Sequence, residues 1–249
     1  MILLKTLSGL CDAALALTFP EACEACGAAS IERRGDVPAC EACWQQTRLF
    51  KGDETLCWKC GAPAGGEVER GKWEQVRCRR CEAEEFTAAR ACGVYEGALR
   101  ASVLRLKREP FVGARLRRLL GEAAGRPPLS SATLVVPVPL HEERKRERGF
   151  NQAALLAGAV AGRSGLPSDG LSLVRALRAE RHRAGMDARS RRETVEGAFS
   201  VARPRLVEGE RVLLIDDVFT TGATASACAS ALREAGAGEV FVLTAARAL

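Results

Sequence analysis

The sequence predicts an α/β fold with a mostly parallel, doubly wound sheet, preceded by a small cysteine-rich module. From about Arg90 onward, short apolar runs alternate with helical segments, which is the pattern of a parallel sheet covered by helices. The preceding residues are rich in Cys and Gly and lack a periodic apolar core. A chain of 249 residues has room for both parts, one full-sized domain and one smaller module.

Residues 1–19 predict an amphipathic N-terminal helix. Apolar residues recur there at alternating spacings of four and three, at Leu3, Leu7, Leu10, Ala14 and Leu17. A signal peptide is the alternative, although the segment has a single Lys and carries Asp12 inside its apolar stretch. No other stretch approaches the ~20 apolar residues that cross a bilayer. We expect the leading helix to dock on another surface, in a protein whose C-x-x-C cysteine pairs indicate a reducing, cytoplasmic compartment.

Residues 20–87 predict a double zinc ribbon module. Eight of the eleven cysteines form four C-x-x-C pairs, Cys23/Cys26, Cys40/Cys43, Cys57/Cys60 and Cys78/Cys81. Repeated pairs at this spacing are typical of zinc knuckles, since Zn²⁺ takes four thiolates in a tetrahedron. A segment with so little apolar core also needs a metal in order to fold. The module is therefore expected to hold one or two structural zinc ions, with disulfides and an iron–sulfur cluster as less favoured alternatives.

The order of the pairs predicts how the cysteines share metal. The first two pairs are separated by 13 residues and the last two by 17, and both gaps suit zinc ribbons. The two clusters have a similar layout and resemble a degenerate tandem repeat. A pairing of the second knuckle with the third stays open, because 13 residues separate those as well.

Residues 88–249 predict the α/β domain. The expected strands are Ala91–Tyr95, Ala132–Pro139, a short apolar run at Leu171–Val174, Val212–Ile215 and Val240–Thr244. The expected helices are Gly97–Lys107, Gly113–Gly125, Asn151–Arg163 and Ala223–Glu234. Residues 178–194 are polar and arginine-rich without a hydrophobic period, so they predict a long loop, which in a compact domain is more often functional than accidental.

The most informative run is V-L-L-I-D-D-V-F-T-T-G-A-T, residues 212–224. Its apolar residues predict a buried strand that delivers Asp216 and Asp217 to the edge of the sheet where α/β folds bind ligands. The turn that follows enters a helix, and its N–H groups, Thr hydroxyls and helix dipole form a cradle for phosphate. Gly222 permits the tight turn. Carboxylates beside a phosphate cradle fit a 5-phosphorylated ribose, and neither a Walker A nor a G-x-G-x-x-G dinucleotide motif is present.

This run resembles the motif by which type I phosphoribosyltransferases bind phosphoribosyl diphosphate (PRPP). The segments V-P-V-P-L at 136–140 and R-G-F-N-Q at 148–152, together with the paired knuckles in front, extend the likeness over nearly the whole chain. The combination resembles the ComF family of competence-associated, phosphoribosyltransferase-like proteins. The resemblance implies a type I phosphoribosyltransferase fold behind the zinc ribbons, PRPP with Mg²⁺ as ligand, and a link to DNA uptake.

The resemblance also implies roles for individual residues. Asp216 and Asp217 are the expected catalytic pair. PRPP is expected to contact Val218, Thr220, Thr221, Gly222, Ala223, Thr224, Pro137, Val138, Lys107, Arg148 and Asn151, with Arg144 as a further basic candidate. Residues 178–194 then correspond to a mobile hood over the site.

Two functions stay open at this point. The hood segment departs from the family pattern at Arg183, Met186 and Thr194, which leaves both a phosphoribosyltransferase with an unknown acceptor and a binding protein that retains only the fold. The binding protein would handle single-stranded DNA beside a competence helicase, at the periphery of the uptake machinery. Seven arginines lie between Arg175 and Arg192; they could track DNA phosphates, but a diphosphate ligand alone would also explain them.

The distribution of charge supports an anionic ligand in the second part of the chain. Residues 1–87 carry 11 basic against 14 acidic side chains, whereas residues 88–249 carry 26 against 17. The cysteine module therefore lacks the basic surface that is expected of a nucleic-acid clamp. The positive field belongs to the α/β domain, where phosphate groups would be bound.

Overall fold

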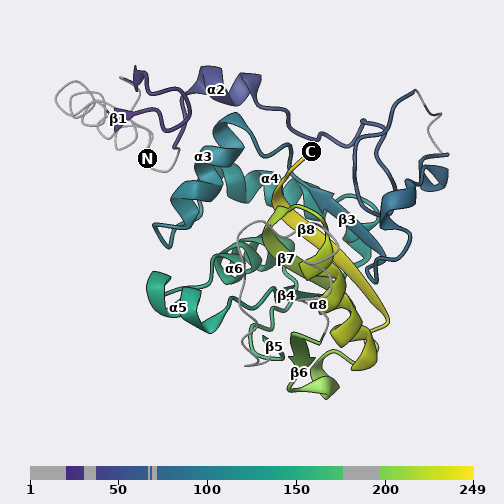
Figure 1. The fold of residues 1–249 in the computed structure, drawn as a ribbon. Coiled ribbons are helices and arrows are strands. Elements are labelled where there is room, and N and C mark those ends of the chain that lie inside the picture. The colour runs from purple at the N-terminus through teal and green to yellow at the C-terminus, as the bar shows by residue number, and fades with distance from the viewer. Residues whose placement is uncertain (1–20, 31–37, 67, 69–71, 176–196) are drawn as a thin grey trace, which may run out of the picture.

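The computed structural model describes residues 21–30, 38–66, 68, 72–175 and 197–249. A four-stranded parallel sheet forms the centre, with strand order β3-β8-β7-β4 (Figure 1). Its strands are β3 (Ala88–Ala91), β8 (Glu239–Arg247), β7 (Arg211–Phe219) and β4 (Leu134–Pro137). The expected α/β architecture with a parallel sheet is confirmed.

Helices cover both faces of this sheet. The first face carries α3 (Gly97–Leu106), α4 (Ala114–Ala124) and α6 (Gln152–Ser164), and the second carries α8 (Ala223–Glu234) with a hairpin of β5 (Leu173–Arg175) and β6 (Phe199–Val201). Alternation along β7 supplies both cores, because successive strand residues point to opposite faces. Leu213 and Ile215 belong to the core under α3, α4 and α6, whereas Val212 and Leu214 belong to the core under α8.

The remaining elements are short. They comprise β1 (Glu21–Ala22), β2 (Ala29–Ser30), α2 (Glu41–Gln46), α5 (Glu142–Arg148) and the 3₁₀ turns Trp73–Gln75, Arg79–Cys81, Leu129–Ser131 and Pro204–Leu206. The helix α5 was not predicted, since all seven of its residues are charged and show no apolar period. His141 caps its start, by accepting from the Glu143 amide, and Gly149 ends it in the left-handed conformation.

Most predicted elements agree with the structure, and the differences have physical causes. The bounds of α8 agree fully, and those of α3, α4 and α6 lie within one residue of the prediction. The strand β3 begins three residues and ends four residues earlier than expected, because its pairing with β8 runs from Ala88 to Ala91. The apolar run at 171–174 does not join the main sheet: β5 pairs with β6 in a separate antiparallel hairpin.

The cysteine module lies against the sheet and shares its two cores. Cys23 and Trp44 belong to the core under α3 and α4, whereas Cys57, Cys81 and Phe86 belong to the core under α8. The division between residues 87 and 88 therefore stays a prediction. The predicted helix over 1–19 and the loop over 178–194 lie outside the described residues. In the part of the chain that is described, no helix is long and apolar enough to span a bilayer.

Candidate functional site

The two adjacent carboxylates lie where the strand β7 extends beyond the end of its neighbour β4. The last residue of β4, Pro137, pairs with Ile215, whereas the pairing of β7 with β8 continues to Phe219. The sequence predicted that the strand ends at Ile215; it instead runs through the carboxylates. Since neighbouring strand residues point to opposite faces, Asp216 and Asp217 approach the end of the sheet from its two sides.

Asp217 is held by groups from the first face. Its Oδ2 lies 3.1 Å from Lys107 Nζ, at the C-terminal end of α3, and accepts from Gln152 Nε2 in α6 at 3.4 Å. Only 9% of Asp217 is exposed. An ion pair with an amide hydrogen bond satisfies a buried carboxylate, and it places a basic side chain beside the acidic pair.

Asp216 has a different environment. Its own Oδ1 accepts from the Asp217 amide at 2.8 Å. Burial, and next the charge of Asp217, raise the pKa of Asp216 to about 7. The carboxyl is therefore poised to change its proton near neutral pH, which is common for groups at ligand sites.

A glycine turn connects β7 with α8, and we call residues 220–224 the phosphate loop. Gly222 has φ +89° and is the residue before the first turn of α8. A Cβ at this position would lie 3.0 Å from Phe219 Cζ, so both the backbone and the space favour glycine. The first N–H groups of a helix have no intrahelical acceptor; the Ala223 amide donates to Thr221 Oγ1 at 3.4 Å within the phosphate loop.

A cavity of about 490 Å³ opens between these groups and the loop after β4. We call it the ligand cavity. It is lined by Lys107, Val138, Pro139, Leu140, His141, Glu143, Arg144, Arg148, Gln152, Arg175, Asp216, Asp217 and Thr224. Lys107, which follows α3, and basic side chains from α5 and β5 therefore lie around three carboxylates, the adjacent pair and Glu143, and the start of α8. The volume and the mixed charges suit a phosphorylated small molecule with an associated cation.

The structure brings together many of the residues predicted to form the site. Lys107, Val138, Arg148, Asp216, Asp217 and Thr224 line the ligand cavity, and Arg144 does so too. The remaining predicted contacts, Pro137, Val218, Thr220, Thr221, Gly222, Ala223 and Asn151, are not among its lining residues. Most of these form the strand ends and the phosphate loop next to it.

Asn151 has a supporting position. Its Oδ1 caps α6 by accepting from the Ala153 amide, and its Nδ2 donates to the Val138 carbonyl at 3.0 Å. Both ends of the amide are thus used within the protein. Asn151 holds the loop after β4 against the start of α6, and its direct contact with PRPP stays a prediction.

Gln152 is a cavity residue that the sequence prediction missed, and Arg175 lines the cavity although it was predicted only as a member of the arginine cluster. Gln152 is 6% exposed, and its Oε1 has no partner among the described residues; the same holds for Arg148 Nη1. Buried polar atoms are normally paired, so these two atoms offer an acceptor and a donor to a ligand. Gln152 belongs to the R-G-F-N-Q run and could have been inferred from it, whereas Arg175 reaches the cavity only through the β5–β6 hairpin.

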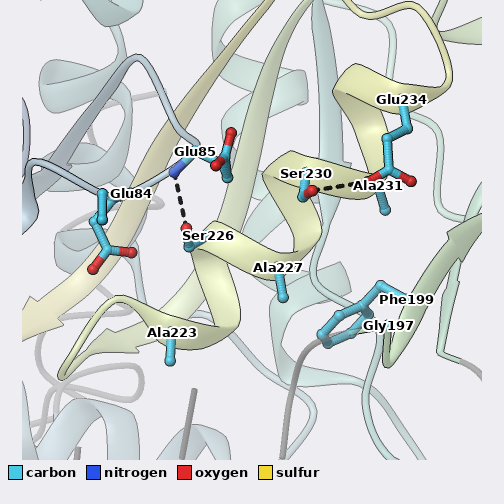
Figure 2. A pocket seen from close by; sticks show the side chains of 11 residues that line it. Glu84, Glu85, Gly197, Phe199, Ala223, Ser226, Ala227, Ser230, Ala231 and Glu234 are labelled. Atoms are coloured by element: carbon cyan, nitrogen blue, oxygen red, sulfur yellow. Dashed lines mark hydrogen bonds between the residues drawn. The ribbon is translucent and has the colours of Figure 1, made fainter. Parts of the chain in front are cut away.

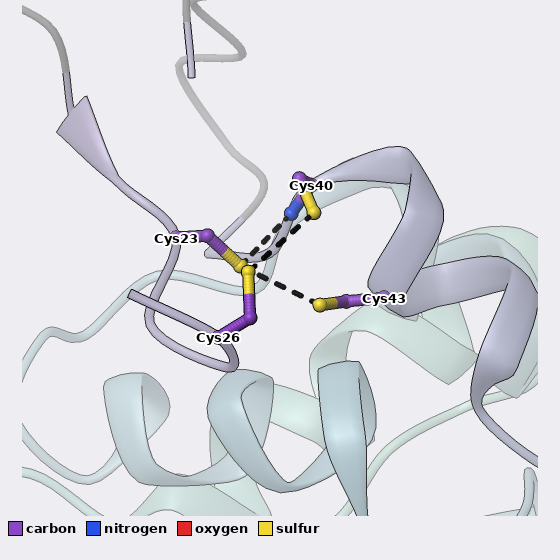
Figure 3. A group of neighbouring side chains, drawn as sticks. All are labelled: Cys23, Cys26, Cys40 and Cys43. Carbon is purple, nitrogen blue, oxygen red and sulfur yellow. Dashed lines mark hydrogen bonds between the residues drawn. The ribbon is translucent and has the colours of Figure 1, made fainter. Parts of the chain in front are cut away.

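Four cysteines converge at what we call site one, Cys23, Cys26, Cys40 and Cys43 (Figure 3). The sulfurs of Cys23 and Cys43 lie 3.8 Å apart, and those of Cys26 and Cys40 lie 4.0 Å apart. Tetrahedral Zn²⁺ with Zn–S bonds of about 2.3 Å requires sulfur separations of about 3.8 Å. Site one therefore fits a structural zinc ion.

Site two consists of Cys57, Cys60, Cys78 and Cys81. Its sulfur separations are 3.6 Å for Cys57–Cys81 and 3.5 Å for Cys60–Cys78. Burial by itself raises the pKa of Cys57, but amide donors at Cys60 and Cys78 outweigh it and lower the pKa to about 6, which favours the thiolate that binds metal. Site two also fits zinc, and the pairing of the second knuckle with the third is wrong.

The two sites repeat the same backbone contacts. In each, the amide of the third cysteine donates to the first sulfur at 3.3 Å, from Cys40 to Cys23 and from Cys78 to Cys57. In each, a glycine after the second cysteine has positive φ, +74° at Gly27 and +71° at Gly61. These shared contacts agree with the interpretation of a degenerate tandem repeat.

Comparison with known proteins places the chain among its relatives. No family model matches the chain. DNA utilization protein YhgH of Salmonella typhi is 32% identical over 203 residues, which are 78% of this chain and 85% of that protein. Competence protein F of Haemophilus influenzae is 35% identical over 46% of this chain and 50% of its own. Competence protein ComFC of Bacillus subtilis is 36% identical over 41% of this chain and 39% of its own.

Among solved structures, the glutamine PRPP amidotransferase from B. subtilis complexed with ADP and GMP is 26% identical. That likeness covers 51% of this chain and 25% of the enzyme chain, with a TM-score of 0.35. Since so partial a likeness adds little, the fold rests on the strand order described above. Given relatives that match most of its length and two four-cysteine sites in front of a parallel sheet, the chain belongs to the ComF family of phosphoribosyltransferase-like proteins.

Proposed function

We propose that the chain binds PRPP with Mg²⁺ in the ligand cavity and transfers its phosphoribosyl group to an acceptor, in a process linked to DNA uptake. The observation that carries the proposal is the cavity itself. It places the adjacent carboxylates of Asp216 and Asp217, several basic side chains and the start of α8 around about 490 Å³. A ribose with a phosphate at one end and a diphosphate at the other needs those three kinds of group.

The proposed pose follows from the charges. The 5-phosphate accepts from the N–H groups of the phosphate loop, assisted by the dipole of α8. Asp216 and Asp217 accept hydrogen bonds from ribose hydroxyls. Lys107, which lies beside Asp217, and Arg148 bind the diphosphate, with Arg144 and Arg175 as further counter-charges.

In the proposed reaction, the bond from C1 of the ribose to diphosphate breaks and a bond from C1 to the acceptor nucleophile forms. Lys107 and Arg148 stabilise the departing diphosphate, and the carboxylates stabilise the positive charge that develops on the ribose. Bound Mg²⁺ would neutralise diphosphate oxygens, held largely through the ligand. Because Lys107 pairs with Asp217 at 3.1 Å without ligand, we expect this pair to loosen when diphosphate binds.

Calorimetric titration of PRPP with Mg²⁺ tests the proposal. Wild-type protein should bind, and Asp216→Asn/Asp217→Asn should abolish both binding and pyrophosphate release, since the neutral amides cannot replace two carboxylates. The exposed Asp53 provides the matched control, and Asp53→Asn should bind as wild type does. Undiminished binding by the double variant would contradict the proposal.

A second candidate is a non-catalytic binding protein for single-stranded DNA that acts with a protein partner such as a competence helicase. The names of the relatives, DNA utilization protein and competence protein, favour this function. So do the exposed basic residues of α5, Arg144, Lys145 and Arg146, next to the ligand cavity. Salt-dependent binding of a short single strand without any pyrophosphate release would favour this candidate.

A further inference from the structure

A buried arginine at the end of β8 connects site two with the residue that precedes the phosphate loop. Arg247 is 9% exposed, and its Nη1 donates to the Cys60 carbonyl at 2.6 Å. Its Nη2 lies 3.9 Å from Cys60 Sγ. Zn²⁺ with four thiolates is a doubly negative group, so the guanidinium lies where it offsets that charge, and it is fixed to the knuckle by a hydrogen bond.

The same guanidinium holds the residue that precedes the phosphate loop. Arg247 pairs with Phe219 across β7 and β8, and its Cζ lies 4.6 Å from the centre of the Phe219 ring. Phe86 packs against this ring edge-on, with the centroids 5.9 Å apart. An arginine on one side and an aromatic edge on the other leave the ring little freedom to move.

Phe219 in turn borders the glycine of the phosphate loop. A Cβ on Gly222 would lie 3.0 Å from the Phe219 ring and 3.5 Å from the carboxylate of Glu84. Glu84 follows site two by three residues, and its amide donates to the Cys81 carbonyl at 3.2 Å. The chain after site two therefore forms one wall of the turn at Gly222.

A further hydrogen bond attaches this chain segment to the first turn of α8. The Glu85 amide donates to Ser226 Oγ at 2.9 Å, and Figure 2 shows Glu84 and Glu85 beside Ala223 and Ser226. Site two thus contacts the phosphate loop from two directions, through Arg247 and Phe219 and through residues 84 and 85.

We propose that site two positions the phosphate loop, with Arg247 as the positioning residue, so that zinc at this site sets the affinity for phosphorylated ligands. The proposal rests on the proposed function only where it names PRPP as the ligand. Site one offers the contrast, because its arginine, Arg115, lies over Trp44 at 4.7 Å and pairs with Glu41 at 2.7 Å. Those partners belong to α2, away from the phosphate loop.

The test compares Arg247→Met with Arg115→Met in the full, zinc-loaded chain. Each substitution removes a guanidinium that stacks on an aromatic ring near a cysteine site. Zinc content is measured by release to a colorimetric chelator, amide hydrogen exchange is measured over residues 219–226, and PRPP affinity is measured by calorimetry. Arg247→Met should exchange faster over 219–226 and bind PRPP about tenfold more weakly, since small displacements at a site are costly. Arg115→Met should match wild type in amide exchange over residues 219–226 and in PRPP affinity.

The readouts separate the two proposals. If wild-type protein fails to bind PRPP, the proposed function is wrong, while the exchange difference still decides the role of Arg247. Unchanged exchange in Arg247→Met, or an equal change in Arg115→Met, would overturn the inference. If Arg247→Met does not fold, Phe219→Leu replaces it: this variant leaves every cysteine contact in place and must show the same faster exchange.

Discussion

Site one and site two share a sequence unit but differ in what surrounds them. Cys26 of site one is exposed and two further cysteines are half-buried, whereas three of the four cysteines of site two are buried. Site one lies near α2, α3 and α4, and site two lies behind the end of β7 and the start of α8. The same knuckle unit can therefore be packed into different surroundings, and under our proposal those surroundings determine whether a site also positions the phosphate loop.

We expect the largest difference in stability between the two sites when one zinc ligand is removed from each. Cys57→Ser removes a buried thiolate from the core under α8, and a structural zinc contributes directly to folding. We expect loss of one zinc equivalent and a fall in Tm of more than about 10 °C. Cys26→Ser, at the exposed edge of site one, should lower Tm by less than half as much. Equal falls in Tm, measured by thermal unfolding at fixed zinc concentration, would contradict the distinction.

The glycines of the two knuckles test how tightly each site is packed, because alanine adds a single Cβ at either position. Gly27 and Gly61 have φ of +74° and +71°, so alanine is strained at either position by about 1 kcal/mol. A Cβ at Gly27 would meet nothing within 4 Å, whereas at Gly61 it would lie 2.5 Å from the Ala89 carbonyl oxygen. Gly61→Ala should therefore reduce the free energy of unfolding by roughly 2 kcal/mol more than Gly27→Ala. Urea denaturation of the two variants measures this difference, and indistinguishable values would show that site two is not packed against β3.

The pH dependence of stability tests the environment of Asp216 in the ligand cavity. Burial and the neighbouring Asp217 raise the pKa of Asp216 from 3.8 to about 7. A raised pKa means that the folded protein prefers the protonated carboxyl. The stabilisation is therefore complete below about pH 4 and is lost as the pH rises through about 7. Asp216→Asn stays neutral, so its Tm should exceed that of wild type by roughly 4 °C at pH 8 and by much less at pH 4.

The same carboxyl predicts proton release on binding. A ribose hydroxyl or a nearby cation favours the ionised form of Asp216, so PRPP with Mg²⁺ should displace a proton below about pH 7. Titrations at pH 6.5 in two buffers with different ionisation enthalpies measure that proton. Identical binding enthalpies in both buffers would count against Asp216 as a contact.

The smallest expected effect concerns the ion pair beside site one. Arg108 Nη2 lies 2.6 Å from Glu24 Oε2, but the arginine side chain is 59% exposed. Exposed pairs contribute little, so Arg108→Met should change the free energy of unfolding by less than about 1 kcal/mol and leave PRPP binding unchanged. The difference from wild type should shrink in 1 M salt. A larger loss of stability would mean that polar contacts, and not the metal, hold site one in place.

The features of this protein that have local causes could be predicted from its sequence. Knuckle spacing singled out all eight cysteines whose sulfurs converge in the two clusters, since a C-x-x-C turn is a short-range structure. Helical periodicity and glycine signals set the bounds of α8 without error, and the D-D-V-x-T-T-G run located the carboxylates and the phosphate loop. These predictions succeeded because their causes lie within about a dozen residues.

Features that depend on contacts between residues far apart along the chain became apparent only in the folded structure. It showed that the first knuckle converges with the second and the third with the fourth. It also carried β7 through Asp216 and Asp217 by pairing with β8, and brought Gln152 and Arg175 into the ligand cavity. It also placed Arg247 between Cys60 and Phe219, residues far from each other along the chain. Composition and spacing cannot encode such contacts, since strand order and the packing of site two against the sheet create them.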